Sequence, residues 1–260
     1  MFSKLGLQLY TIRDYMKDNE SIDKSLERLV EIGYTEAQTA GQESEEFANL
    51  TKKHGITIVG THTDYNAIIN EPDRMMKMHD MLGTKNIGIG GMPTFGRTTY
   101  DGLMNFIESY NKAAEIYSKH GFKLTYHNHS FEFVRINGNK TAMDYMYENF
   151  DKKNISFVLD TCWLANAGAD VRHWLEKLEG RVDILHLKDL SSVYVDESFW
   201  SQPRLCEIGN GNIWWDGVLE TAERTGIKHY VVEQDGHWID GDPFKSIEVS
   251  YNFLKKYIKE

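Results

Sequence analysis

Three polar residues each stand directly after a short apolar run, where a strand of a parallel sheet would end. Asp160 closes the run SFVLD, His186 lies within DILHLKD, and Glu233 follows the run YVV. Side chains at the carboxyl ends of parallel barrel strands meet at one mouth. A mixed set of imidazole and carboxylate groups suits Mn²⁺, Mg²⁺, Co²⁺ or Zn²⁺. An ion with an open coordination position could polarise a carbonyl or bind adjacent hydroxyls.

The segment TYHNHSFEF adds three further candidates, His127, His129 and Glu132. Each of these groups has an ordinary explanation, because a lone strand-end aspartate often caps a helix and a lone histidine is often a hydrogen-bonded loop residue. Four such positions together are harder to explain in this way, since each follows an apolar strand that would not tolerate an unpaired charge. The sequence therefore predicts one divalent metal site.

Two more residues could take part in chemistry at the same mouth. His62 follows the third apolar run, where it could bind substrate or could equally be a hydrogen-bonded loop histidine. Lys188 lies two residues beyond His186, so strand alternation could point both side chains the same way. A desolvated lysine could act as an acid or as an electrostatic stabiliser. It could equally form an ion pair with Asp160 or Glu233.

Other candidates are contacts for a substrate rather than reactive groups. Trp163 could give the mouth an apolar wall, although aromatic side chains there are as often simple packing. Arg204 lies in the segment from Ser191 to Asn212, and a connection of that length in a compact domain is usually functional, often a lid. Further hydroxyl binders at the ends of the first two runs are Gln8, Tyr10, Glu36 and Gln38.

The apolar runs alternate with longer amphipathic stretches along the whole chain. The predicted strands are Leu5–Leu9, Tyr34–Gln38, Ile56–Gly60, Asn86–Ile89, Phe122–His127, Ile155–Asp160, Val182–Leu187 and Tyr230–Glu233. Apolar strands without polar alternation suit a parallel sheet buried on both faces. Glycine precedes several strands in the segments EIGYTE, KHGITI, KHGFKL and RTGIKH, as expected of a helix C-cap. The sequence therefore predicts an α/β fold, with residues 1–260 forming a single (β/α)8 TIM barrel domain.

Composition excludes several classes of protein. The net charge of −10 disfavours nucleic-acid binding, because an acidic surface repels phosphate backbones. The two cysteines make no disulfide framework, which suggests reduced thiols in a cytoplasmic protein. No signal peptide and no run of about 18 apolar residues is visible, so we expect no membrane partner.

The motifs resemble those of the xylose isomerase-like TIM barrel superfamily, in the group called sugar phosphate isomerases/epimerases. The matching segments are GLQLYTIRD, EIGYTEAQ, YHNHSFEF, FVLDTCWLANAGAD, ILHLKDL, EIGNGNIWWDGVL, YVVEQDG and DPFKSIEVSYNFLKKY. In the related ketose 3-epimerases, the resemblance implies a metal held by Glu, Asp, His and Glu from strands five to eight. The last three carry over to Asp160, His186 and Glu233.

The first ligand departs from that pattern, because Tyr126 stands where the epimerase glutamate would be. We assign Glu132 as the fourth ligand, with His129 as its main rival. The histidine that often follows the strand-six aspartate by three residues is replaced by Trp163. The resemblance implies that, in the epimerases, one metal-bound glutamate takes a proton from carbon and a second returns it. Glu233 matches one of these two glutamates.

The resemblance implies a metal-dependent isomerase or epimerase on a small carbohydrate, with Glu233 and a strand-five group, Glu132 or a histidine, moving the proton. The alternative is a dehydratase or lyase on an oxidised sugar, 3-oxo-glycoside or inosose. It would use Glu233 or His129 as base and Lys188 or a histidine as acid. An abasic-site endonuclease is disfavoured, because it needs more histidines and a less acidic surface. A non-catalytic sugar binder and a homo-oligomer both stay open.

Overall fold

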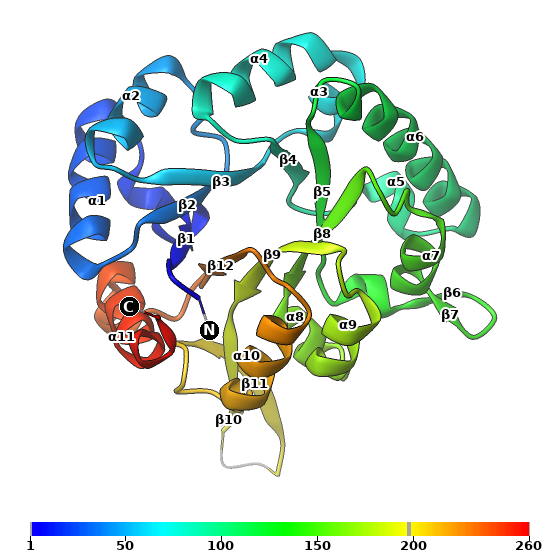
Figure 1. The fold of residues 1–260 in the computed structure, drawn as a ribbon. Coiled ribbons are helices and arrows are strands. Elements are labelled where there is room, and N and C mark those ends of the chain that lie inside the picture. The colour runs from blue at the N-terminus through cyan, green and yellow to red at the C-terminus, as the bar shows by residue number, and fades with distance from the viewer. Residues whose placement is uncertain (1, 197–198, 260) are drawn as a thin grey trace.

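A closed, all-parallel barrel of eight strands forms the centre of the computed structural model, which describes residues 2–196 and 199–259. Its strands are β1 (Gly6–Gln8), β2 (Glu36–Thr39), β3 (Thr57–His62), β4 (Asn86–Ile89), β5 (Lys123–His127), β8 (Ile155–Asp160), β9 (Val182–Leu187) and β12 (His229–Val232). They follow one another around the barrel in chain order, and β12 closes it against β1 (Figure 1). The predicted (β/α)8 barrel is therefore confirmed.

Helices cover the outside of the barrel (Figure 1). They are α1 (Asn19–Ile32), α2 (Glu45–Lys53), α3 (Tyr65–Asn70), α4 (Pro72–Leu82), α5 (Thr94–Arg97), α6 (Tyr100–Ser118), α7 (Ala142–Asn149), α8 (Thr161–Asn166), α9 (Val171–Lys177), α10 (Trp215–Arg224) and α11 (Pro243–Leu254). A 3-10 turn at Lys255–Tyr257 follows α11 directly.

The barrel strands alternate between an inner and an outer face, and this parity positions the site. Val59, Val158, Ile184 and Val231 form a separate buried cluster of four aliphatic side chains. Successive side chains of a strand point to opposite faces, so residues two positions further on face the interior again. Asp160, His186 and Glu233 follow three of these valine and isoleucine positions by two residues. The inner aliphatic cluster therefore lies directly beneath the polar groups in the interior of the barrel.

Tyr126 of β5 faces the opposite way, into the layer between the barrel and the helices. Its ring lies 5.8 Å from that of Phe106, 5.7 Å from that of Phe150 and 6.4 Å from that of Phe157, measured between centroids. Its neighbour His127 must then point into the barrel.

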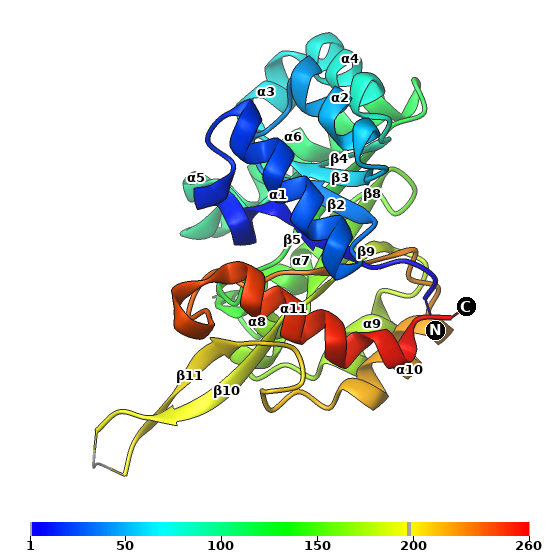
Figure 2. The ribbon, with the colours of Figure 1, turned by 90° about the vertical axis from the view of Figure 1, so that its left-hand side faces the viewer.

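A two-stranded hairpin follows β9 and projects from the barrel (Figure 2). It consists of β10 (Asp189–Tyr194) and β11 (Ser201–Cys206), paired antiparallel with Leu190 opposite Leu205. This hairpin occupies most of the segment predicted as a lid. A smaller antiparallel pair, β6 (Arg135–Asn137) and β7 (Lys140–Thr141), follows β5.

Within the described residues, the structure contains no helix that is both long enough and apolar enough to cross a membrane.

Candidate metal centre

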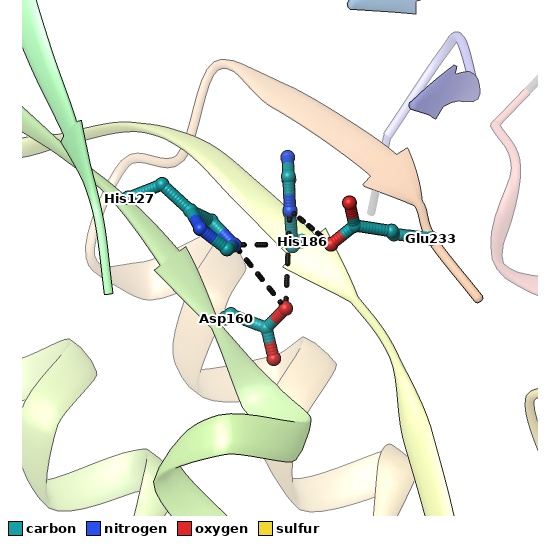
Figure 3. A group of neighbouring side chains, drawn as sticks. All are labelled: His127, Asp160, His186 and Glu233. Carbon is teal, nitrogen blue, oxygen red and sulfur yellow. Dashed lines mark hydrogen bonds and ion pairs between the residues drawn. The ribbon is translucent and has the colours of Figure 1, made fainter. Parts of the chain in front are cut away.

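Four buried side chains from consecutive barrel strands converge at the carboxyl ends of β5, β8, β9 and β12 (Figure 3). They are His127, Asp160, His186 and Glu233, and one ligand atom from each lies within 4.8 Å of all the others. We call these four residues the metal group. Asp160 Oδ2 lies 3.4 Å from His127 Nε2 and 3.9 Å from His186 Nδ1. Glu233 Oε2 lies 3.0 Å from His186 Nδ1 and 3.8 Å from His127 Nε2.

These separations fit a divalent transition-metal ion. Zinc–nitrogen and zinc–oxygen bonds are about 2.1 Å long, so neighbouring ligand atoms of a tetrahedral site lie about 3.4 Å apart. The four measured separations, from 3.0 to 3.9 Å, lie on either side of that value. The group could therefore hold an ion after small side-chain adjustments. A set of two imidazoles and two carboxylates does not by itself distinguish zinc from manganese, cobalt or magnesium.

Hydrogen bonds to the far nitrogen of each imidazole leave the near nitrogen free to bind an ion. His127 Nδ1 lies 3.2 Å from the carbonyl oxygen of Gly90, which can only accept, so Nδ1 carries the proton. His186 Nε2 lies 2.5 Å from Gln38 Oε1 and donates to it in the same way. Partners of this kind orient metal-ligating histidines and raise their basicity. The lone pairs of His127 Nε2 and His186 Nδ1 therefore face the centre of the group.

Asp160 both caps a helix and contributes to the metal group. Its Oδ1 accepts a hydrogen bond of 2.9 Å from the backbone N–H of Trp163, which makes it the N-cap of α8. Its Oδ2 is left to face His127, His186 and Lys188. One oxygen of Asp160 therefore caps the helix, as the ordinary interpretation expects, and the other is available to an ion.

Lys188 places a buried positive charge beside the metal group. Its Nζ lies 2.5 Å from Asp235 Oδ2, 3.2 Å from Glu233 Oε2 and 3.7 Å from Asp160 Oδ2. Burial alone would lower the pKa of Lys188, but these three carboxylates outweigh it and raise the pKa. Burial would likewise raise the pKa of Glu233, yet Lys188 and His186 hold it well below the usual range. Lys188 is therefore an ammonium ion and Glu233 a carboxylate.

A cavity of about 390 Å³ opens beside the metal group, large enough for a monosaccharide-sized ligand. It is lined by Tyr10, Arg13, His62, Gly90, His127, His129, Lys188, Glu233 and Asp235. Burial, helped by the nearby His127, lowers the pKa of His129 to about 3, and burial also lowers the pKa of His62 well below its usual value. Both of these histidines are therefore neutral.

The structure brings together most of the predicted site residues. Asp160, His186 and Glu233 lie in the metal group as predicted, and Lys188, His129 and His62 line the adjoining cavity. Trp163 packs against this region, with Lys188 Nζ 4.7 Å from the centroid of one of its rings. Arg204 lies on the exposed strand β11, where it lines a different cavity together with Trp163 and His237.

Glu132, assigned from the resemblance as the fourth ligand, lies outside the metal group, and His127 occupies that position instead. The Glu132 side chain is fully buried and its two oxygens are bonded elsewhere. Oε1 accepts a hydrogen bond of 2.5 Å from the Tyr126 hydroxyl, and Oε2 accepts one of 2.8 Å from the backbone N–H of His129. Burial raises the pKa of Glu132 to about 7. Glu132 therefore accepts a hydrogen bond from the outward-facing Tyr126 and stabilises the loop that carries His129.

Some residues of the metal group and of the cavity beside it were missed or underrated from the sequence. His127 was expected as a substrate contact or as a histidine that moves the proton, and not as a metal ligand, although it lies two residues beyond Thr125, just as Asp160 lies two beyond Val158. Asp235 was not singled out, although it lies two residues beyond Glu233. Strand parity is the signal that could have indicated both residues. Arg13 had no such signal, because its contacts are to the backbone carbonyls of Tyr10 and Asp235.

The chain belongs to the family of xylose isomerase-like TIM barrels, whose model matches residues 26–257. In a segment of 163 residues, it is 25% identical to an inosose dehydratase of Clostridium perfringens, covering 59% of this chain and 52% of that protein. Aligned segments span between 30% and 53% of the inosose dehydratases compared. The curated relatives that this chain matches in sequence are thus named as dehydratases, within a family whose model is described as xylose isomerase-like.

Solved structures share the fold along the whole chain. A sugar phosphate isomerase/epimerase from Parabacteroides distasonis superposes with a TM-score of 0.79 at 23% identity, covering 100% of this chain and 96% of the other. The IolI protein, crystallised with a bound zinc atom, gives a TM-score of 0.73 at 17% identity, covering 98% of each chain. At these identities the similarity is evidence for the fold alone.

Proposed function

We propose that this chain is a divalent-metal-dependent lyase or dehydratase that acts on an oxidised, polyhydroxylated substrate such as a 3-oxo-glycoside or an inosose. It would remove a proton alpha to the ketone and eliminate an oxygen substituent from the beta carbon. The observation that carries this proposal is the composition of the metal group, which pairs one glutamate with a histidine where the epimerase relay has a second glutamate. The nearby Glu132 is bonded to Tyr126 and His129.

A divalent ion in the metal group would act as a Lewis acid towards the substrate carbonyl and an adjacent hydroxyl. Glu233 makes its contacts with His186, Lys188 and His127 through Oε2, which leaves Oε1 to act as the base. It takes the proton from the alpha carbon, and the electrons of that bond form a carbon–carbon double bond. The bond between the beta carbon and its oxygen breaks, and the electron pair leaves with the oxygen.

The departing oxygen then needs a proton, and Lys188 is the group in place to supply it. Its ammonium lines the same cavity as Glu233 and contacts Asp235, whose side chain is 27% exposed and so connects Lys188 to solvent protons. The products are an unsaturated ketone and water or an alcohol. A base and an acid on neighbouring strands of one cavity are what this reaction requires.

Isomerisation or epimerisation, the reaction expected first from the resemblance, is the second candidate. It shares the proton removal but needs a group to return the proton to carbon. The observation in its favour is His129, a neutral cavity residue whose buried Nδ1 has no hydrogen-bond partner in the described part of the chain. His129 could also replace Glu233 as the base for elimination.

The test uses D₂O and a panel of 3-oxo-glucosides, inososes and ketoses, with protein loaded with Mn²⁺, Co²⁺, Zn²⁺ or Mg²⁺. Elimination predicts loss of water or of the aglycone, with an unsaturated ketone seen by mass spectrometry and NMR. Deuterium gain on an unchanged carbon skeleton would instead assign an isomerase or epimerase. No turnover and no exchange with any metal would reject both.

Two variants separate the steps. Glu233→Gln should abolish both deuterium exchange and elimination, because the base is lost. Lys188→Gln should retain exchange at the alpha carbon while elimination slows by about 10²-fold or more, which is typical of removing a general acid. His129→Gln serves as the comparison, since loss of exchange in that variant alone would make His129 the base.

A further inference from the structure

Two buried glutamines connect the metal group to His62. The backbone N–H of Tyr10 donates to Gln8 Oε1 over 3.2 Å, so the other end of the Gln8 amide must be its NH₂ group. That NH₂ group donates to Gln38 Oε1 over 3.0 Å and faces His62 Nδ1 at 3.3 Å. Both glutamine side chains are inaccessible to solvent. One backbone N–H therefore orients both amides.

The orientation of these amides fixes the tautomers of two histidines. Gln38 Oε1 also lies against His186 Nε2, which must carry a proton, so His186 Nδ1 stays free for an ion. At the other end, the NH₂ group of Gln8 can only donate, so His62 Nδ1 must accept. A proton on Nδ1 would face another N–H group. The neutral His62 ring therefore carries its proton on Nε2.

The Nε2 atom of His62 is buried and has no hydrogen-bond partner among the residues that the structure describes. The His62 ring lines the cavity of about 390 Å³ together with Glu233 and His129. Its centroid lies 4.9 Å from that of His127, a member of the metal group. A buried N–H group without an acceptor costs free energy. Because the His62 ring lines the cavity, an acceptor on a ligand bound there would relieve this cost after a small side-chain movement.

We propose that His62 is an uncharged N–H donor to a hydroxyl or carbonyl oxygen of the substrate, and that Gln8 is the positioning residue that fixes this role. The proposal rests on the function proposed above for the same cavity. It defines a substrate feature beyond the reaction type, because the bound molecule must present a hydrogen-bond acceptor beside the metal group. A substrate with an ammonium or alkyl group at this point would offer the His62 N–H no acceptor and should therefore bind poorly.

The tautomer can be tested without metal or substrate, by NMR of protein labelled with ¹⁵N in its histidines. The His62 signals are assigned by their loss in His62→Gln. We expect a protonated Nε2 and an unprotonated Nδ1. In Gln8→Glu, the new carboxylate should accept a proton from His62 Nδ1, so the pattern should change to a protonated Nδ1. The matched control is Gln202→Glu on exposed β11, which adds the same charge and should leave the ring signals unchanged.

Turnover of the best substrate in the panel tests the donor role. His62→Phe should lower kcat/KM by about 10- to 100-fold, as for the loss of one hydrogen bond to a buried partner. His62→Gln keeps an N–H near the Nε2 position and should recover most of that loss. A proton on Nδ1 in the wild type, unchanged signals in Gln8→Glu, or an unchanged kcat/KM in His62→Phe would overturn the proposal. If no substrate were turned over, the proposed function would fail, while the tautomer result would still decide whether His62 can donate.

Discussion

Glu132 illustrates how a side chain beside the metal group can be structural. Both of its oxygens accept hydrogen bonds from its own segment, one from the Tyr126 hydroxyl and one from the backbone N–H of His129. His127, between those two residues, points the other way into the barrel. The Glu132 carboxylate therefore stabilises the loop beside the site, whereas the imidazole of His127 is itself part of the metal group.

Glu132→Gln should lower the free energy of unfolding by about 1–3 kcal/mol, because an amide places N–H groups against one of two buried donors. Urea unfolding followed by circular dichroism measures this. Glu115→Gln, at an exposed pair with Lys119 on α6, is the control and should change stability by less than about 1 kcal/mol. If Glu132→Gln were as stable as the wild type but lost its metal, Glu132 would be a ligand after all.

His79 predicts a pH dependence of stability away from the site. Its Nδ1 donates to the carbonyl oxygen of Met75 and its Nε2 accepts from the Thr61 hydroxyl, each over 2.7 Å. Burial lowers the pKa of His79 from 6.5 to about 4. The unfolded chain therefore takes up a proton near pH 6.5, whereas the folded chain resists until about pH 4. The stabilisation is fully present above pH 6.5 and is lost as the pH falls towards 4.

His79→Gln should remove this part of the pH dependence, because glutamine keeps a polar group but does not titrate. The difference in unfolding free energy between wild type and variant should shrink by about 3 kcal/mol between pH 7 and pH 4. Urea unfolding of both proteins at each pH gives the difference, in which the other titrating groups cancel. A difference that stays constant with pH would show that His79 is not buried in its neutral form.

At the scale of elements, one carboxylate next to Lys188, that of Asp189, connects the hairpin β10–β11 to the segment that leads into α10. Asp189 Oδ2 accepts hydrogen bonds from the backbone N–H groups of Gly209 and Gly211 and from Trp215 Nε1. Its Oδ1 accepts from the backbone N–H groups of Leu190 and Ile213. A carboxylate with so many donors ties the start of the hairpin to the chain that leads into α10. No described residue of the hairpin lines the cavity beside the metal group, so the lid role stays a prediction.

Asp189→Asn should lower the free energy of unfolding by about 2 kcal/mol or more, because the amide N–H groups would face donors of this buried network. It should also slow turnover, since Lys188 is the preceding residue. Thermal unfolding and kcat are the measurements. Asp14→Asn, at an exposed position, is the control and should stay within about 0.5 kcal/mol of the wild type. An unchanged melting temperature in Asp189→Asn would mean that the carboxylate does not anchor the hairpin.

At the scale of the whole molecule, the barrel was predictable because its signals are local. Short apolar runs separated by amphipathic stretches, with glycine before several strands, placed all eight strands to within a few residues of their observed bounds. The positions of Asp160, His186 and Glu233 followed from the same pattern, since each comes at the end of such a run. The carboxyl ends of the strands of a parallel barrel converge at one mouth, and this convergence does not depend on the conformation of the loops.

The remaining features depended on which way a side chain points and on the path of the chain beyond the strand. Glu132 was placed in the metal group from a family pattern, whereas the parity of β5 directs His127 inward and Tyr126 outward. Arg204 was predicted from the length of its segment, which does not reveal that the chain forms a hairpin with this residue on an exposed strand. The amide pair Gln8 and Gln38 joins the neighbouring strands β1 and β2, and its hydrogen bond depends on the direction in which each side chain points.

The most direct test of the account is the metal content of three proteins after loading with excess Zn²⁺ or Mn²⁺ and gel filtration, measured by elemental analysis. The wild type should hold one divalent ion per chain, and so should Glu132→Gln. The double variant His127→Ala/His186→Ala should hold none while keeping the circular dichroism spectrum of the folded barrel. A wild type that binds no ion, or a double variant that binds as much as the wild type, would contradict the metal centre on which the proposed chemistry depends.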